Sequence, residues 1–222
     1  MLQPDTLQFL AELKENNNKA WFDTNRPRFE NAKQDLLALV ESLIKKLGKT
    51  DADIAVLAAK DCVFRQNRDV RFSKNKSPYK INMGTYLNRG GKKSPLAGYY
   101  FHCEPGDKSF VGGGIWMPEA PALKKVRQEI DYSFDEFKKI LAKKTFVNQY
   151  GDLNIKEHTL SREPKGYEKE NPAIKYLKLK SFVALRPLTD NDLTGNDLEK
   201  KIVTAFDALQ PLIHFLNRSM AE

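Results

Sequence analysis

Cysteine is scarce in this 222-residue chain, which contains only Cys62 and Cys103. The two cysteines form neither a Cys-x-x-Cys pair nor a disulfide framework. No apolar run approaches the roughly 20 residues that a membrane helix needs. The first residues show neither the basic start nor the apolar stretch of a secretion signal. These absences predict a soluble protein of the reducing cytoplasm that has no membrane partner.

Motifs of common catalytic and cofactor sites are also missing. The sequence has no Gly-x-Ser-x-Gly elbow, no phosphate-binding P-loop and no dinucleotide fingerprint. The three histidines, His102, His158 and His214, lack the spacing of metal ligands, so we expect no metal site and no cofactor. Asp69, Glu104 and His102 are formal candidates for a general base, but no geometric argument selects one of them. Whether the chain is an enzyme therefore stays open.

Positive charge is present in excess, and it is concentrated in one segment. The chain carries 37 Lys and Arg residues against 29 Asp and Glu residues, a net charge of +8. Residues 60–93 contain ten basic and two acidic residues, so this segment alone accounts for the whole excess. A local excess of this kind attracts anions, which is a statement about partners and not about fold.

Apolar residues recur at helical spacing near both ends of the chain. The pattern predicts helices over residues 4–15, from about 26 to 47, around 52–60, over 123–130 and 134–141, and over 198–216. Asn25 and Ser133 precede two of these helices and are suited to cap them, and Gly48 is suited to end one.

The middle of the chain has the alternating pattern of β-strands. Tyr99, Phe101 and Cys103 alternate with more polar residues, and residues 104–107 have the composition of a turn. The expected strands are 99–103, 109–117, 81–88, a possible fourth at 62–66 and a late one at 181–186. Short connections favour antiparallel pairing. We therefore expect one α+β domain over residues 1–222, with helices packed on a mainly antiparallel sheet.

Three consecutive glycines, Gly112 to Gly114, lie between apolar residues and are expected within a strand. One interpretation is that a ligand or another backbone approaches closely at this point. The other is a bulge or a bend of the sheet, and we favour it.

The segment 64–80 is the strongest candidate for a binding site. Arg65, Arg68 and Arg71 recur every three residues, and guanidinium forks beside hydroxyl groups are suited to phosphate or carboxylate ligands. Asp69 is suited to orient one of these arginines. The predicted ligand-binding residues are Arg65, Arg68, Asp69, Arg71, Lys76, Tyr79 and Lys80, joined from distant segments by Lys19 and Lys165. The expected partner is a small anionic ligand whose identity the sequence does not give.

Two other interpretations of the same basic segment stay open. Phe72 and Tyr79 are suited to stack on bases, which would make the segment a nucleic-acid-binding face. No helix-turn-helix, zinc-finger or other recognised nucleic-acid-binding motif accompanies it. Alternatively, the arginines pair with carboxylates of the fold, and the protein has a structural or interaction role without catalysis. The oligomeric state is not predicted.

Four blocks of the sequence together carry a family resemblance. They are Asn17-x-Lys19-x-Trp21-Phe22, the long block from Arg65 to Lys80 containing Arg-Asp-Val-Arg-Phe-Ser, Gly112-Gly113-Gly114-Ile115-Trp116-x-Pro118, and Pro164-Lys165-Gly166-Tyr167. In this order the blocks resemble the signature of an uncharacterised bacterial and fungal family, a domain of unknown function. The resemblance covers nearly the whole chain and implies one full-length domain. It implies no activity, so it assigns no catalytic role to any residue.

Overall fold

The computed structural model describes every residue except 93, 156–158 and 221–222. Contacts divide the chain into two compact units. The first contains Met1–Leu87, Tyr100–Val111 and Pro187–Thr204, and the second contains Asn88–Tyr99, Gly112–Arg186 and Ala205–Glu222. Whether the chain acts as one domain, as the sequence suggests, stays a prediction. In the described part of the chain, no helix combines the length and the apolar character needed to span a membrane.

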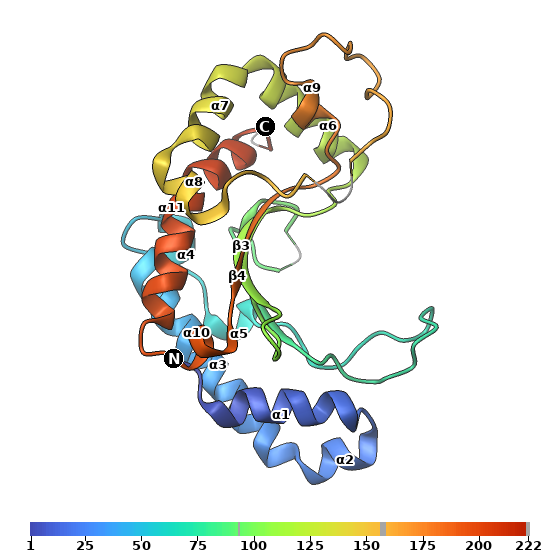
Figure 1. The fold of residues 1–222 in the computed structure, drawn as a ribbon, viewed down its shortest axis with the longest axis vertical. Coiled ribbons are helices and arrows are strands. Elements are labelled where there is room, and N and C mark those ends of the chain that lie inside the picture. Colours follow the sequence, from blue (N-terminus) through green and yellow to red (C-terminus); the bar gives the residue numbers. More distant parts are fainter. Residues whose placement is uncertain (93, 156–158, 221–222) are drawn as a thin grey trace. The chain divides into compact units, whose positions relative to one another are not determined.

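The structure combines helices with a four-stranded antiparallel sheet, which confirms the α+β prediction (Figure 1). The helices are α1 (Pro4–Glu15), α2 (Lys19–Thr24), α3 (Arg26–Leu47), α4 (Ala52–Ala55), α5 (Ala59–Cys62), α6 (Ala120–Tyr132), α7 (Phe134–Ala142), α8 (Lys144–Tyr150), α9 (Ile174–Leu177), α10 (Asp190–Thr194) and α11 (Leu198–Arg218). The strands are β1 (Met83–Leu87), β2 (Gly98–Cys103), β3 (Ser109–Ile115) and β4 (Phe182–Leu188), and they pair in this order.

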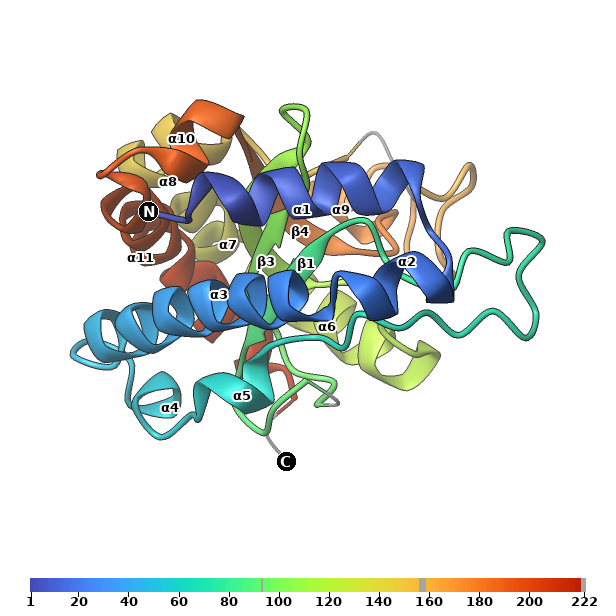
Figure 2. The same ribbon diagram turned by 90° about the horizontal axis from the view of Figure 1, so that it is seen from below.

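In the first unit, α1 and α3 lie side by side (Figure 2). Their apolar stripes are buried, with Phe9 and Leu13 of α1 and Leu36 and Leu43 of α3 almost without exposed surface. Each such side chain contributes roughly 1.5–3 kcal/mol by leaving water. The predicted bounds of α1 are confirmed, because Pro4 starts the helix and Asn16 follows its end.

Alternation along β2 is confirmed, since Tyr99, Phe101 and Cys103 are buried while Tyr100 and His102 are half-buried. The expected strand at 62–66 is wrong. Cys62 ends helix α5, and the residues after it pair with β1 through an isolated bridge from Val63 to Thr85 and not as a strand. The late strand expected at 181–186 is confirmed, because β4 covers Phe182–Leu188 and completes the four-stranded sheet.

Several helices differ from the sequence predictions. Helices α2, α8, α9 and α10 were not predicted, and the expected piece at 52–60 is two short helices, α4 and α5. Asn25 and Ser133 do stand at helix starts, but neither side chain caps its helix. The Asn25 amide donates back to the carbonyl of Trp21, and the Ser133 hydroxyl donates to Glu129. Local hydrogen bonds of this kind compete with capping.

The glycine run lies within β3, as predicted, and all three glycines are buried. A Cβ atom on Gly112 would come within 2.1 Å of the carbonyl oxygen of Ala184, and one on Gly114 within 1.9 Å of that of Phe182. A Cβ atom on Gly113 would lie 2.2 Å from the carbonyl oxygen of Gly98 on the other neighbouring strand. The glycines therefore permit neighbouring backbones to approach closely on both sides of β3.

Gly113→Ala is expected to destabilise the protein by about 3 kcal/mol, because the added methyl group meets backbone that cannot move aside independently. Gly166→Ala is the control, since its Cβ would meet open space and its positive φ of 92° costs about 1 kcal/mol. Denaturant unfolding of both variants measures the difference. Equal losses in the two variants would show that the sheet tolerates a side chain at Gly113.

Candidate functional site

The basic segment forms an irregular hairpin between α5 and β1. The amide of Arg68 donates to the carbonyl of Pro78 at 2.9 Å, and that of Lys80 donates to Gln66 at 2.9 Å. These two bonds flank an antiparallel bridge between Asn67 and Tyr79. In Figure 2 the connection between α5 and β1 projects past the end of α2. The hairpin brings residues that are ten or more positions apart in sequence to one place.

A single side chain fixes this hairpin to the end of helix α1. In an antiparallel bridge without its own hydrogen bonds, the N–H and C=O groups point outward. Those of Tyr79 meet the carboxamide of Asn17: the Tyr79 amide donates to Oδ1 at 3.0 Å, and Nδ2 donates to the Tyr79 carbonyl at 3.0 Å. Because a carboxamide offers the same donor and acceptor as a peptide group, Asn17 replaces a neighbouring strand.

Aromatic packing holds the same junction from the other side. The ring of Tyr79 stacks on that of Phe22 in α2, with centroids 3.9 Å apart and planes 13° from parallel. Both residues are buried. Helix α2 itself begins at Asn18, whose side chain accepts a hydrogen bond from the amide of Trp21. The asparagines after α1 therefore set both the helix and the hairpin in place.

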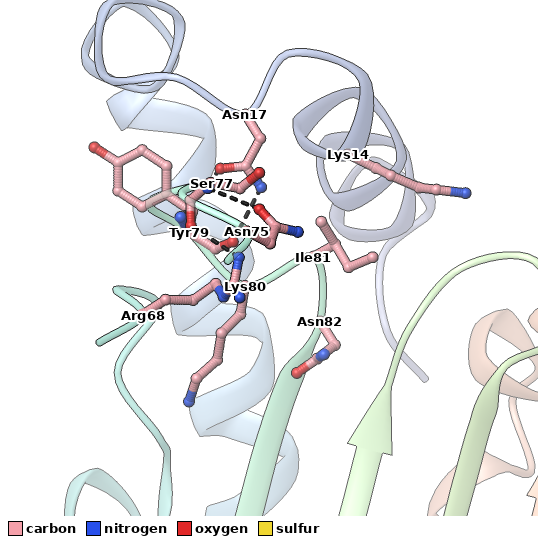
Figure 3. Close-up of a pocket in the computed structure, with 9 residues that line it drawn as sticks. All are labelled: Lys14, Asn17, Arg68, Asn75, Ser77, Tyr79, Lys80, Ile81 and Asn82. Atoms are coloured by element: carbon pink, nitrogen blue, oxygen red, sulfur yellow. Dashed lines mark hydrogen bonds between the residues drawn. The ribbon is translucent and has the colours of Figure 1, made fainter. Parts of the chain in front are cut away.

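A pocket of about 320 Å³ lies at this junction (Figure 3). Its lining residues come from the end of α1, from the turn that follows it and from the hairpin: Lys14, Asn17, Arg68, Asn75, Ser77, Tyr79, Lys80, Ile81 and Asn82. Three of these nine side chains are cationic, and none is acidic. The structure thus brings together three of the predicted residues, Arg68, Tyr79 and Lys80.

Arg68 is the best-fixed cation of the pocket. Its Nη1 donates to the carbonyl of Ser77 at 3.0 Å, and its Nη2 lies 3.4 Å from the hydroxyl of Ser73. Within the part of the chain that the structure describes, no carboxylate pairs with it. Two of its five N–H groups are engaged, so the guanidinium is held in place while its charge is not neutralised.

Lys80 leads from the pocket toward the sheet. Its ammonium nitrogen lies 5.2 Å from the ring centroid of Phe64, which is the geometry of a cation–π contact. Lys14 lines the opposite side from α1, and in Figure 3 its ammonium group points away from Asn17 and Ser77.

Other predicted residues of the hairpin lie outside the pocket lining. Both Nε and Nη2 of Arg71 donate to the carboxylate of Asp69, at 3.0 and 2.6 Å. This fork lowers the pKa of Asp69 and raises that of Arg71. Lys76 donates to the backbone carbonyl of Val70 at 3.0 Å and so closes the tip of the hairpin. The fork and Lys76 therefore shape the loop.

The remaining predicted residues are exposed. Arg65 lies near enough to Asp69 to lower the pKa of that carboxyl further. Lys19 forms an ion pair with Asp23 on α2, and this pairing raises the pKa of Lys19. Lys165 belongs to the second compact unit. The pocket lining includes none of these three residues.

Six residues of the pocket lining were not predicted to bind a ligand: Lys14, Asn17, Asn75, Ser77, Ile81 and Asn82. The carboxamide of Asn75 accepts a bond from the amide of Ser77 at 2.9 Å, a local turn that an Asn-x-Ser spacing permits. Nothing local marks Asn17, because its partner lies 62 residues away.

Metal ligands do not gather in the described part of the chain, where no group of three or more His, Cys, Asp and Glu residues could hold an ion. His158, one of the three histidines considered above, lies outside the described residues. Cys103 is buried, and burial raises the pKa of its thiol to about 12. Such a thiol stays protonated at neutral pH and is a poor nucleophile.

Asn17→Ala is expected to destabilise the protein by about 2 kcal/mol, because it leaves both polar backbone groups of Tyr79 without their partner. Asn16→Ala removes only an exposed bond to Glu12 and should change the stability by less than about 0.5 kcal/mol. Denaturant unfolding compares the two variants. An Asn17 variant as stable as the Asn16 variant would show that the carboxamide does not hold the hairpin.

Comparison with family models gives a match over most of the chain. A family model described as a conserved hypothetical protein (DUF2461) matches residues 5–215. Neither the curated proteins nor the solved structures searched contain a match. The match spans both compact units and confirms the resemblance to an uncharacterised family that the four sequence blocks indicate. The chain therefore belongs to the DUF2461 family of conserved hypothetical proteins.

Proposed function

We propose that the protein binds a small anion, a phosphate or carboxylate compound, in the pocket between the end of α1 and the basic hairpin. The observation that carries the proposal is the position of Arg68. Its guanidinium is fixed by two hydrogen bonds to neutral oxygen atoms and borders a pocket whose lining contains no carboxylate. A fixed, unneutralised guanidinium is suited to paired hydrogen bonds with an oxyanion.

The rest of the lining supports the same chemistry. Lys80 adds a second positive charge, and Lys14 lines the pocket from α1 although its ammonium group points away from Asn17 and Ser77 (Figure 3). Ser77 adds a hydroxyl group, and the carboxamides of Asn75 and Asn82 add donors of the kind that surround bound oxyanions. A volume of about 320 Å³ is in the range of small-molecule pockets. The ligand class is therefore a compact anion and not an extended polymer.

The alternative of a purely structural role requires carboxylate partners for the arginines. Arg71 has one in Asp69, and its guanidinium fork is occupied by that carboxylate. Arg68 has none among the described residues. The two arginines therefore differ in the role that their contacts support. Arg71 has the contacts of an internal ion pair, and Arg68 has those expected of a ligand-binding residue.

Inorganic phosphate and a panel of phosphorylated and carboxylated compounds should raise the melting temperature by binding the native state. A ligand at about 100 times its dissociation constant adds roughly 2.7 kcal/mol to the stability. Arg68→Ala should abolish most of this shift, and Arg68→Lys should retain part, because an ammonium keeps the charge without the fork. Each shift is measured at fixed ionic strength against the same variant without ligand.

Arg26→Ala is the matched control, because it removes an equal charge from an exposed arginine that pairs with Asp23 outside the pocket. It should leave the shift unchanged. Arg71→Ala tests whether the site extends to the hairpin tip, as the sequence suggests. Equal shifts in the wild type, Arg68→Ala and Arg26→Ala would contradict the proposed site.

A second candidate function, nucleic-acid binding, is favoured by one observation at the hairpin tip. The side chain of Phe72 is 95 % exposed, beside the exposed cations Arg71, Lys74 and Lys76. The guanidinium carbon of Arg71 lies 5.8 Å from the centre of its ring. An exposed ring among cations is suited to stack on a base.

If nucleic acid binds there, the affinity should be weak and should fall steeply as salt rises, because neutralised phosphates release counterions. Fluorescence anisotropy with single-stranded and duplex oligonucleotides at several salt concentrations measures this dependence. Phe72→Ala should weaken single-strand binding roughly 5- to 150-fold by removing one stacking contact. Tight, sequence-selective binding at physiological salt would instead make nucleic-acid recognition the leading function.

A further inference from the structure

Three titratable side chains form a hydrogen-bonded row along strand β2 and the residue after it. The hydroxyl oxygen of Tyr100 lies 3.1 Å from Nδ1 of His102, and Nε2 of His102 lies 3.1 Å from a carboxylate oxygen of Glu104. The three residues are two positions apart, so a strand places them on one face. The side chains of His102 and Glu104 are 13 % and 18 % exposed. The row is therefore sheltered but in reach of solvent.

The chemistry of the partners assigns the protons. A carboxylate only accepts hydrogen bonds, so Nε2 of the neutral imidazole carries its hydrogen toward Glu104. Nδ1 then presents a lone pair, which can only accept, and Tyr100 must donate. Burial is the main cause that raises the pKa of Tyr100, and the charge of Glu104 adds to it. The phenol is thus protonated at neutral pH, as this arrangement requires.

Residues of the neighbouring strands hold the side chains of the row in position. His102 stacks on Phe110 of β3, with ring centroids 4.6 Å apart and planes 11° from parallel. Gly84 of β1 leaves room for the phenol, because a Cβ atom there would come within 2.7 Å of the Tyr100 hydroxyl oxygen. Tyr86, a second tyrosine of similar burial, lies on β1 two residues after Gly84. The stack on Phe110 fixes the ring of His102, and the room beside Gly84 lets the Tyr100 hydroxyl group come within hydrogen-bonding distance of it.

The row also lies close to the anion pocket. The ring of Phe64 meets that of Tyr100 edge-on, with centroids 6.3 Å apart, and the same Phe64 ring carries the ammonium group of Lys80. Lys80 lines the pocket. One aromatic ring therefore separates a pocket cation from the first member of the row.

We propose that Tyr100, His102 and Glu104 form an acid–base relay that removes a proton from an anionic ligand, the ligand class resting on the function proposed above. The proton of the ligand's X–H bond passes to the Tyr100 oxygen while the phenol proton passes to Nδ1 of His102. The products are the ligand anion and an imidazolium, whose charge is offset by Glu104. No electrons are transferred to or from the ligand, and the reverse step restores both partners.

The hydrogen bonds of the row follow the same order as those of a nucleophile–base–orienter triad. A hydroxyl donates to one imidazole nitrogen, and a carboxylate fixes the tautomer from the other. In this row the hydroxyl is a phenol. Of the three residues, Tyr100 is the one that connects to the pocket, through Phe64 and Lys80, so the proposal assigns it the ligand's proton, and His102 and Glu104 act through it. The ligand class that fits is a phosphate or carboxylate compound with an acidic C–H bond beside a carbonyl group, since the pocket cations would stabilise the resulting enolate.

The first experiment needs no ligand. Nitrogen-15 NMR of the imidazole groups reads the tautomer of His102, with His214 of α11 as an internal reference. We expect the Nε2–H form in the wild type, a shift of the Nδ1 signal in Tyr100→Phe and a larger share of the other tautomer in Glu104→Gln. A wild-type His102 that carries its hydrogen on Nδ1 would overturn the relay.

The second experiment measures proton removal. Dihydroxyacetone phosphate and pyruvate serve as probes, and proton NMR in D₂O follows deuterium entering the position beside the carbonyl group. Tyr100→Phe should slow enzyme-dependent exchange by roughly 100-fold or more, the usual worth of a positioned general base. Tyr86→Phe is the matched control and should leave the rate unchanged. Exchange at the background rate with both probes, or equal exchange in Tyr100→Phe, would overturn the proposal.

The two proposals fail in distinguishable ways. If Tyr100→Phe loses exchange and keeps the phosphate-induced melting shift, the relay and the pocket are separate and both stand. If the wild type shows no phosphate shift while exchange still depends on Tyr100, the relay stands and the anion pocket fails. If Arg68→Ala loses the shift and Tyr100→Phe exchanges like the wild type, the pocket stands and the relay fails.

Discussion

The carboxamide of Asn17 is the contact on which the candidate site depends. It satisfies both outward-facing polar groups of Tyr79 and so joins the end of α1 to a hairpin 62 residues further along the chain. The stacked rings of Tyr79 and Phe22 close the same junction. Without this pairing the hairpin would have no edge partner, and the polar backbone of Tyr79 would be left unsatisfied away from water. The pocket is the space that this junction encloses with the side chains of Lys14 and Arg68.

Charge in the hairpin is used in two different ways. At the tip, positively charged groups stabilise the conformation of the loop. Arg71 donates to the carboxylate of Asp69, and Lys76 donates to a backbone carbonyl. At the base, the partners that orient Arg68 among the described residues are neutral oxygen atoms, which leaves its charge available to a ligand. A net charge counted along the sequence does not separate these roles, because both arginines contribute equally to it.

Sequence patterns predicted those features that short-range chemistry determines. The bounds of α1 follow from a proline at its start and asparagines at its end, and the alternation along β2 follows from its buried face. The expected strand at 62–66 was wrong because its apolar residues are equally suited to end a short helix, whereas the late strand expected at 181–186 is present as β4. Arg68, Tyr79 and Lys80 were selected from charge and residue type, whereas the roles of Lys14 and Asn17 come from contacts across the fold.

The oxyanion site proposed at Arg68 lies in the pocket that Asn17 holds together. The most direct measurement is a crystal structure of the protein with tungstate, a heavy analogue of phosphate, located by its anomalous scattering. Binding at this site should give a peak within hydrogen-bonding distance of the Arg68 guanidinium, bordered by Lys80 and Ser77, and no such peak in crystals of Arg68→Ala. A peak confined to the hairpin tip or to Lys165, or one that persists unchanged in Arg68→Ala, would contradict it.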